Sequence, residues 1–311
     1  MKLSIILIVT VLCFLLSLLP VFPPISIFAD MGAIIPVENV NLDEPAQRAI
    51  IAYDGFEELL ILQTELKPSK RTLVIRFIPL PSLPDVKAVS NDIFYNLKKL
   101  VERCNLQYVR QTKSLSQSGI TSEKVKIEVK KSIGAHDITV VRATSTEEFL
   151  NWIYNFLKSH GYKNKIKNKQ DYINIVNHYI TNKINYFVFD IVNLKSHISI
   201  QPIMYTFNSK TLYYPLVATN ILRSYGTIEL FIFSENGRSY LSSIYGFLPS
   251  TTAIVKSEDT SRISPKITEL LGRHAILQAF KYRGKLYFDR DIEENPGIIL
   301  KRTSPLKIYS N

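Results

Sequence analysis

The sequence predicts an α+β protein built mainly from antiparallel sheet, with a pair of helices near its middle. Apolar runs of strand length, separated by turn residues, occupy 46–79 and 185–233. A capping box and apolar residues at helical spacing predict a helical hairpin over about 146–181, and the same spacing predicts a further helix over about 90–103. The resulting order, strands, helix, strands, helix pair and strands, is typical of an α+β fold.

The first 29 residues predict export. Lys2 is followed by an uncharged apolar run, Leu3–Phe22, and prolines then end the helix. Ala29 offers a small residue for cleavage before Asp30, which favours a signal peptide; the run is also long enough to span a bilayer as an uncleaved anchor. In both cases the chain from Asp30 onward lies outside the cytoplasm.

Composition and charge limit the kinds of partner that the protein is expected to bind. With 311 residues, 46% of them hydrophobic, the chain can bury a sizeable core. The formal charge of +11 favours an anionic partner, which for an exported protein means an anionic envelope or lipid surface rather than nucleic acid. The alternative is a lysine-rich surface that mainly sets solubility, because no compact arginine cluster occurs.

We expect one main domain over 30–233, with an inner boundary at the polar stretch 105–122, and a β-rich C-terminal extension over 234–311 that packs on the same body. Strands at 46–53, 58–66 and 72–79 predict an antiparallel meander. Further expected elements are strands at 124–130, 136–142, 186–194, 198–207 and 227–233, a hairpin turn at Asn236-Gly237, a short helix at 267–271, and a hairpin over 275–288 turning at Arg283-Gly284. Prolines 79, 81 and 84 are expected to end the first sheet.

No motif in the chain assigns a reaction. The histidines are too far apart for a metal motif, and His136 and Asp137, as neighbours on a strand, point to opposite faces and form no dyad. Glu147/Glu148 open a helix, and Cys104 has no thiol partner because Cys13 lies in the leader. We therefore predict no catalytic, cofactor-binding or metal-binding residues, after weighing the five histidines (His136, His160, His178, His197, His274), the acid pairs Glu57/Glu58 and Glu293/Glu294, the basic run 163–169, and the tyrosines 213, 214, 240 and 245.

Several segments, taken together in order, resemble an uncharacterised group of exported prokaryotic proteins, domain of unknown function 2330. The resemblance covers roughly 30–233 and rests on GAIIPVE (32–38), EPAQRAIIAYD (44–54), IRFIPLPSLPDV (75–86), DITVVRATSTEEFLNWIYNFLKSHGY (137–162), NYFVFDIVNL (185–194), ISIQPIMYTF (198–207) and YYPL (213–216). It departs at Arg76-Phe77, where that group commonly has tryptophan. It implies an extracytoplasmic location and an α+β body, and no established activity.

These observations lead to one expected function and one alternative. The expected function is an exported cell-envelope protein with a non-enzymatic binding or structural role, without a cofactor. The alternative is an exported hydrolase whose site is assembled from distant acidic and histidine residues. Convergence of two or more of the five histidines and acidic side chains in one pocket would overturn the expected function.

Overall fold

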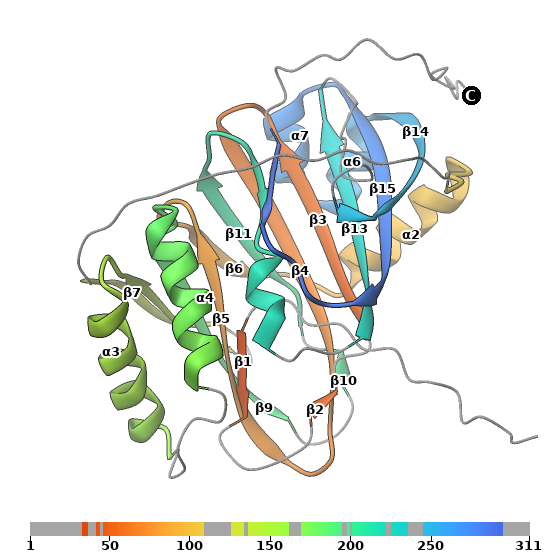
Figure 1. Cartoon of the computed structure of the whole chain (residues 1–311). Coiled ribbons are helices and arrows are strands. Elements are labelled where there is room, and N and C mark those ends of the chain that lie inside the picture. The colour runs from red at the N-terminus through yellow and green to blue at the C-terminus, as the bar shows by residue number, and fades with distance from the viewer. Residues whose placement is uncertain are drawn as a thin grey trace, which may run out of the picture.

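The computed structural model describes residues 33–36, 42–43, 46–108, 126–133, 136–161, 169–194, 198–199, 201–221, 225–235 and 245–294. The predicted leader, most of the predicted inner boundary, His197 and Tyr240 lie outside these residues. Figure 1 shows two sheets in the interior, with α3 and α4 on one side of the molecule and α2 on the opposite side.

The smaller sheet has five strands in the order β1–β5–β9–β8–β7, all antiparallel. Its central strand β9 pairs along its whole length with β5. Both strands are mostly apolar because both of their faces are covered; each carries one charged residue near its centre, Arg76 on β5 and Asp190 on β9. The strands are β1 (Ala33–Pro36), β5 (Thr72–Leu80), β9 (Tyr186–Leu194), β8 (His136–Arg142) and β7 (Lys126–Ile133).

The larger sheet has nine strands, seven of which follow the order β14–β15–β13–β3–β4–β11–β6. The β3–β13 pair is parallel, whereas the other described pairs are antiparallel. The strands are β14 (Leu248–Lys256), β15 (His274–Lys285), β13 (Tyr225–Ser234), β3 (Ala46–Tyr53), β4 (Glu57–Pro68), β11 (Ile203–Asn208) and β6 (Asp85–Ala88), with β2 (Leu42–Asp43) and β10 (Ile198–Ser199) beside β4. A separate short pair joins β12 (Leu212–Tyr214) to β16 (Ile292–Glu294).

The layers follow from the alternation of side chains along each strand. On β5, Phe77 packs against Phe149 and Phe187 on the helical side, whereas Ile78 faces the larger sheet in one core with Leu60 and Tyr205. The far face of the larger sheet forms a second core. Helices α3 (Thr146–Ser159) and α4 (Lys169–Thr181) cover the smaller sheet; α2 (Asp92–Arg103), α6 (Ser257–Ile263) and α7 (Pro265–Leu271) cover the larger one, and the 3-10 helix η1 (Val217–Ile221) lies against α4.

The α+β class and the predicted helices are confirmed. The hairpin expected over 146–181 is the α3–α4 pair, and the helix expected over 90–103 is α2. Ser145 caps α3 as predicted, because its side chain accepts a hydrogen bond from the backbone N–H of Glu148. In the described part of the chain, every helix is too short or too polar to span a bilayer.

The predicted three-strand meander is wrong. β3 and β4 pair as expected, but β5 crosses to the smaller sheet and pairs with β1 and β9. A strand covered on both faces needs apolar residues on both, and β5 provides them. Pro79 does not end the sheet either, since it lies within β5. The pairing with β1 stops at Phe77, so one side of Pro79 is a sheet edge, where a strand tolerates proline.

One predicted hairpin is also absent, and another lies outside the described residues. The turn expected at Asn236-Gly237 falls within 236–244, outside the described residues, and the described strands on either side, β13 and β14, each pair with β15 rather than with each other. Arg283-Gly284 is not a turn, since β15 continues to Lys285. Gly284 has another role: a Cβ there would lie 2.8 Å from the Tyr282 hydroxyl, which donates a hydrogen bond to the carbonyl of Lys285. The C-terminal residues 245–285 are thus part of the larger sheet and its helical cover.

Candidate functional site

One buried charged cluster joins three strands of the smaller sheet. Arg76 on β5 is opposite Asp190 on β9, and its guanidinium forms an ion pair with the Asp190 carboxylate. The second Asp190 oxygen lies 2.9 Å from His136 Nδ1 on β8. The exposed fractions of these three residues are only 4%, 0% and 2%. The face they share is the one directed at the larger sheet, so the cluster lies between the two sheets.

The electrostatics of this cluster favour an ionised carboxylate. Burial alone would raise the pKa of Asp190, but the Arg76 guanidinium and His136 outweigh burial and hold that pKa below its usual value. His136 Nε2 has no hydrogen-bond partner among the described residues, and neither has the buried hydroxyl of Tyr205 on the opposing sheet. The cluster has the histidine and acid of a hydrolase, but its side chains are sealed from solvent.

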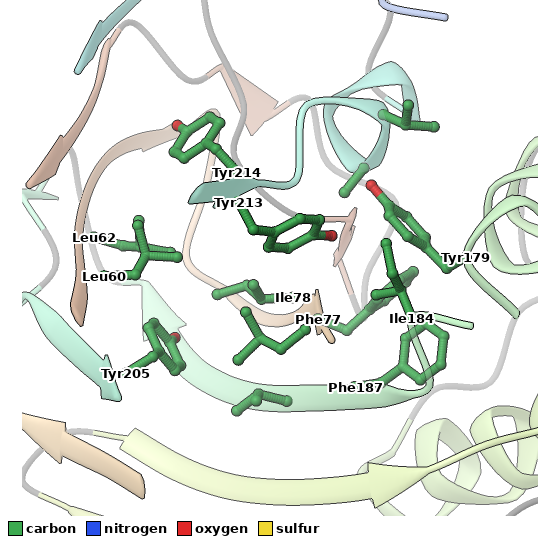
Figure 2. Packing of buried hydrophobic residues seen from close by; sticks show 14 of the residues in the cluster. Leu60, Leu62, Phe77, Ile78, Tyr179, Ile184, Phe187, Tyr205, Tyr213 and Tyr214 are labelled. Atoms are coloured by element: carbon green, nitrogen blue, oxygen red, sulfur yellow. The ribbon is translucent and has the colours of Figure 1, made fainter. Parts of the chain in front are cut away.

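A second buried centre surrounds Asp291, just before β16. Its Oδ1 accepts hydrogen bonds from the Tyr179 hydroxyl at 3.1 Å and the Val217 backbone N–H at 2.7 Å, and its Oδ2 accepts one from the Tyr213 hydroxyl at 3.1 Å. The Tyr245 hydroxyl donates to the Asp291 carbonyl. Figure 2 shows that the rings of Tyr179 and Tyr213 bring their hydroxyls to the same part of the interior.

Burial changes the acidity of this centre. Desolvation raises the pKa of Asp291 to about 7, against the opposing effect of its three donors. Glu58 behaves similarly: it is fully buried, and burial raises its pKa well above the usual range although the backbone N–H of Tyr213 donates to it at 2.7 Å. Tyr213 therefore contacts two buried carboxyl groups, one through its backbone and one through its hydroxyl.

The other residues weighed from the sequence do not converge. His160 ends α3, His178 lies on α4 with its pKa lowered by burial, and His274 is exposed. Cys104 is buried, and desolvation raises its thiol pKa, so it is a packed rather than a reactive cysteine. Asp137 is exposed while His136 is buried, as their alternation on the strand predicted. Within the described residues, no group of three or more His, Cys, Asp or Glu side chains could hold a metal ion.

The surface offers a different kind of site. Four side chains, Tyr225, Arg283, Lys285 and Tyr287, form what we call the basic tyrosine patch at one end of β13 and β15. Tyr225 is directly opposite Lys285 in the ladder, and the Lys285 ammonium lies 5.9 Å from the centre of the Tyr287 ring. The two tyrosines are 57% and 61% exposed. Among the described residues, neither Arg283 nor Lys285 has an acidic partner within ion-pair distance.

The neighbouring surface toward β3 is electrically balanced. Glu229 on β13 pairs with Lys281 at 2.8 Å and with Arg48 at 3.4 Å, and Arg48 also pairs with Glu65 at 3.2 Å. These charges neutralise each other across four adjacent strands of the sheet. The unbalanced positive charge of this region therefore lies in the basic tyrosine patch.

The protein is thus an α+β protein of two packed sheets, with a buried charged cluster around Asp190 and a buried carboxyl group at Asp291. No family model matches the chain, and no curated protein matches it, so the resemblance to domain of unknown function 2330 stays a prediction. Among solved structures, a mutated baculovirus P35 after caspase cleavage is similar at a TM-score of 0.35 and 8% identity, over 82% of this chain and 94% of that one. A likeness this remote supports no inference about function.

Proposed function

We propose that the protein is an exported, non-enzymatic binding protein of the cell envelope, and that the basic tyrosine patch binds an anionic lipid surface. The observation that carries the proposal is that two cations without an acidic partner among the described residues lie beside two exposed tyrosines at one end of the larger sheet. Tyrosine favours the membrane interface because its ring is apolar and its hydroxyl is polar. Arginine and lysine beside it attract anionic headgroups.

The proposal predicts binding that depends on lipid charge. The protein without its first 29 residues should co-sediment with vesicles containing about 30% phosphatidylglycerol, and much less with pure phosphatidylcholine vesicles. The double variant Arg283→Gln/Lys285→Gln should bind about 30-fold more weakly, because each surface cation contributes about 1 kcal/mol to the attraction. Binding should also weaken strongly in about 0.5 M NaCl.

Two controls make the lipid measurement specific. The double variant Lys98→Gln/Lys158→Gln has the same net charge, but its substitutions lie on α2 and α3 rather than on β13 or β15, so its binding should stay near that of the parent protein. A soluble polyanion distinguishes an anionic polymer from a lipid surface: if it displaces the protein fully, the partner is a polymer. Equal loss of binding in both double variants would contradict the proposal.

Export predicts where the native protein is found. Cell fractionation should recover it outside the cytoplasm, in the secreted or membrane fraction. N-terminal sequencing should begin at Asp30 if the leader is cleaved after Ala29, as we expect. An intact Met1 in the membrane fraction would identify an uncleaved anchor instead, and recovery in the cytosol would overturn export.

The alternative function, an exported hydrolase, draws on the pairing of His136 with Asp190. Histidine and acid do converge there, from strands 54 residues apart in sequence, which is the arrangement the alternative requires. Their side chains, however, are 0% exposed, so a substrate could reach them only if the two sheets separated. Because a substrate has no access to this pair while the sheets are packed, the binding function is the better supported of the two.

A further inference from the structure

The segment after β15, residues 286–294, is attached to the body through the buried side chains of Leu286, Phe288 and Ile292 and through the hydrogen bonds of Asp291. Asn220 on η1 exchanges two hydrogen bonds with the backbone of Phe288, and the Asp291 side chain binds α4, β12 and η1 through three donors. Ile292 is buried, and β16 adds a three-residue ladder with β12. Among the polar attachments of this segment, the Asp291 side chain joins three elements, α4, β12 and η1.

The hydrogen bonds around Asp291 can be satisfied with the carboxyl group protonated. The Tyr213 hydroxyl lies 3.1 Å from Asp291 Oδ2 and 3.2 Å from the carbonyl oxygen of Pro79, but it has one proton to donate. If Asp291 is protonated, Oδ2 donates to the Tyr213 oxygen and the Tyr213 hydroxyl donates to Pro79. If Asp291 is ionised, the Tyr213 hydroxyl donates its proton to the carboxylate, and the Pro79 carbonyl then loses its hydrogen bond from Tyr213.

No cation among the described residues compensates the ionised form. From α4, Asp291 meets the Tyr179 hydroxyl, with His178 beside that ring; from β12 it meets Tyr213, and η1 contributes no ionisable side chain. Tyr245 binds the backbone rather than the carboxyl group. Glu58 lies nearby, because the Tyr213 backbone N–H donates to it. The charged residues that flank Asp291 in the chain are Asp289, Arg290, Glu293 and Glu294. Arg290 lies 3.7 Å from Asp289, and the charge of Glu293 disfavours ionisation of Asp291. An isolated buried carboxylate is costly.

We infer that Asp291 is a proton-controlled latch, which holds residues 286–294 against η1, α4 and β12 when protonated and loosens them when ionised. The burial of the group places its pKa at about 7, so the transition falls near neutral pH. The inference does not depend on lipid binding. It bears on the basic tyrosine patch all the same, because Tyr287 is part of the segment that the latch holds.

Hydrogen exchange of the backbone amides in 287–294 tests the latch directly. After correction for the intrinsic pH dependence of exchange, protection in the full chain should fall about tenfold between about pH 6 and pH 8. In Asp291→Asn, protection should be the same at both pH values. Protection that does not change with pH in the parent protein, or that still changes in Asp291→Asn, would overturn the latch.

Matched variants keep the test decisive if Asp291→Asn folds poorly. Tyr213→Phe removes a donor to the ionised carboxylate and should move the midpoint of the transition to higher pH. Tyr245→Phe removes the bond to the Asp291 carbonyl and should lower protection equally at both pH values, without moving the midpoint. Asp289→Asn, whose parent side chain is 81% exposed, should behave like the parent protein. An identical midpoint in the Tyr213 and Tyr245 variants would contradict the latch.

Discussion

Replacing Arg76 by methionine should destabilise the protein by about 3–5 kcal/mol, because it leaves the Asp190 carboxylate buried without its cation. The free energy of unfolding, measured in urea at neutral pH, checks this value. The matched control is Arg48→Met, which removes another arginine of the β-sheets that pairs with acidic side chains. Arg48 is 36% exposed, so its loss should cost no more than about 1 kcal/mol.

A triple variant tests whether the charges of Arg76, Asp190 and His136 serve only as scaffold or are required for the fold. Arg76→Met, Asp190→Leu and His136→Leu together remove every charge, and a packed apolar replacement of a buried ion pair is often neutral or stabilising. If the cluster is scaffold, the triple variant should regain most of the stability lost in Arg76→Met and should still bind anionic vesicles. Failure to regain stability would show that the buried charges are required for the fold.

The protein should be most stable at mildly acidic pH. The folded-state pKa of Asp291 is raised to about 7, and that of Glu58 is also raised, so the folded state binds more protons than the unfolded state. Their contribution is present at low pH and is lost as the pH rises through the folded-state pKa. Asp190 has a lowered pKa, so its contribution is present near neutral pH and is lost on acidification below about pH 4.

Urea unfolding at about pH 5 and pH 8 measures this effect. Asp291 alone should make the free energy of unfolding about 3 kcal/mol larger at pH 5 than at pH 8. Asp291→Asn and Glu58→Gln should each reduce the difference, whereas Asp289→Asn should leave it unchanged. A difference that stays unchanged in both Asp291→Asn and Glu58→Gln would show that neither carboxyl group is protonated in the folded protein; the net difference alone does not, because His178, whose pKa is lowered by burial, changes the stability in the opposite direction over this pH range.

The sequence predicts the helices well because their signals are local. The capping box at Ser145 and the apolar spacing after it specify α3 without reference to the rest of the chain. The assignment of β5 to a sheet depends instead on which distant strand it meets. A short apolar run such as 72–80 is compatible with either sheet, and only the partner β9, more than a hundred residues later, decides between them.

The buried cluster carried a signal that sequence reasoning missed. Arg76 and Asp190 each lie near the centre of an otherwise apolar strand run, and they have opposite charges. A charge in such a run needs a partner, so the two runs could have been paired on that ground. Asp291 gave no comparable signal, because it lies in the charged run DRDIEE, where a buried carboxyl group looks the same as its exposed neighbours.

The parallel pairing of β3 with β13 has a consequence for how the chain reaches its fold. Arg48 and Glu229, which meet across this pair, are 181 residues apart. During synthesis from the N-terminus, one edge of β3 therefore has no partner strand until most of the protein has been made. Contacts this distant in sequence slow folding, and an open apolar strand edge invites pairing with another chain. The protein should thus fold late, as a unit, and be most prone to aggregate before β13 has been synthesised.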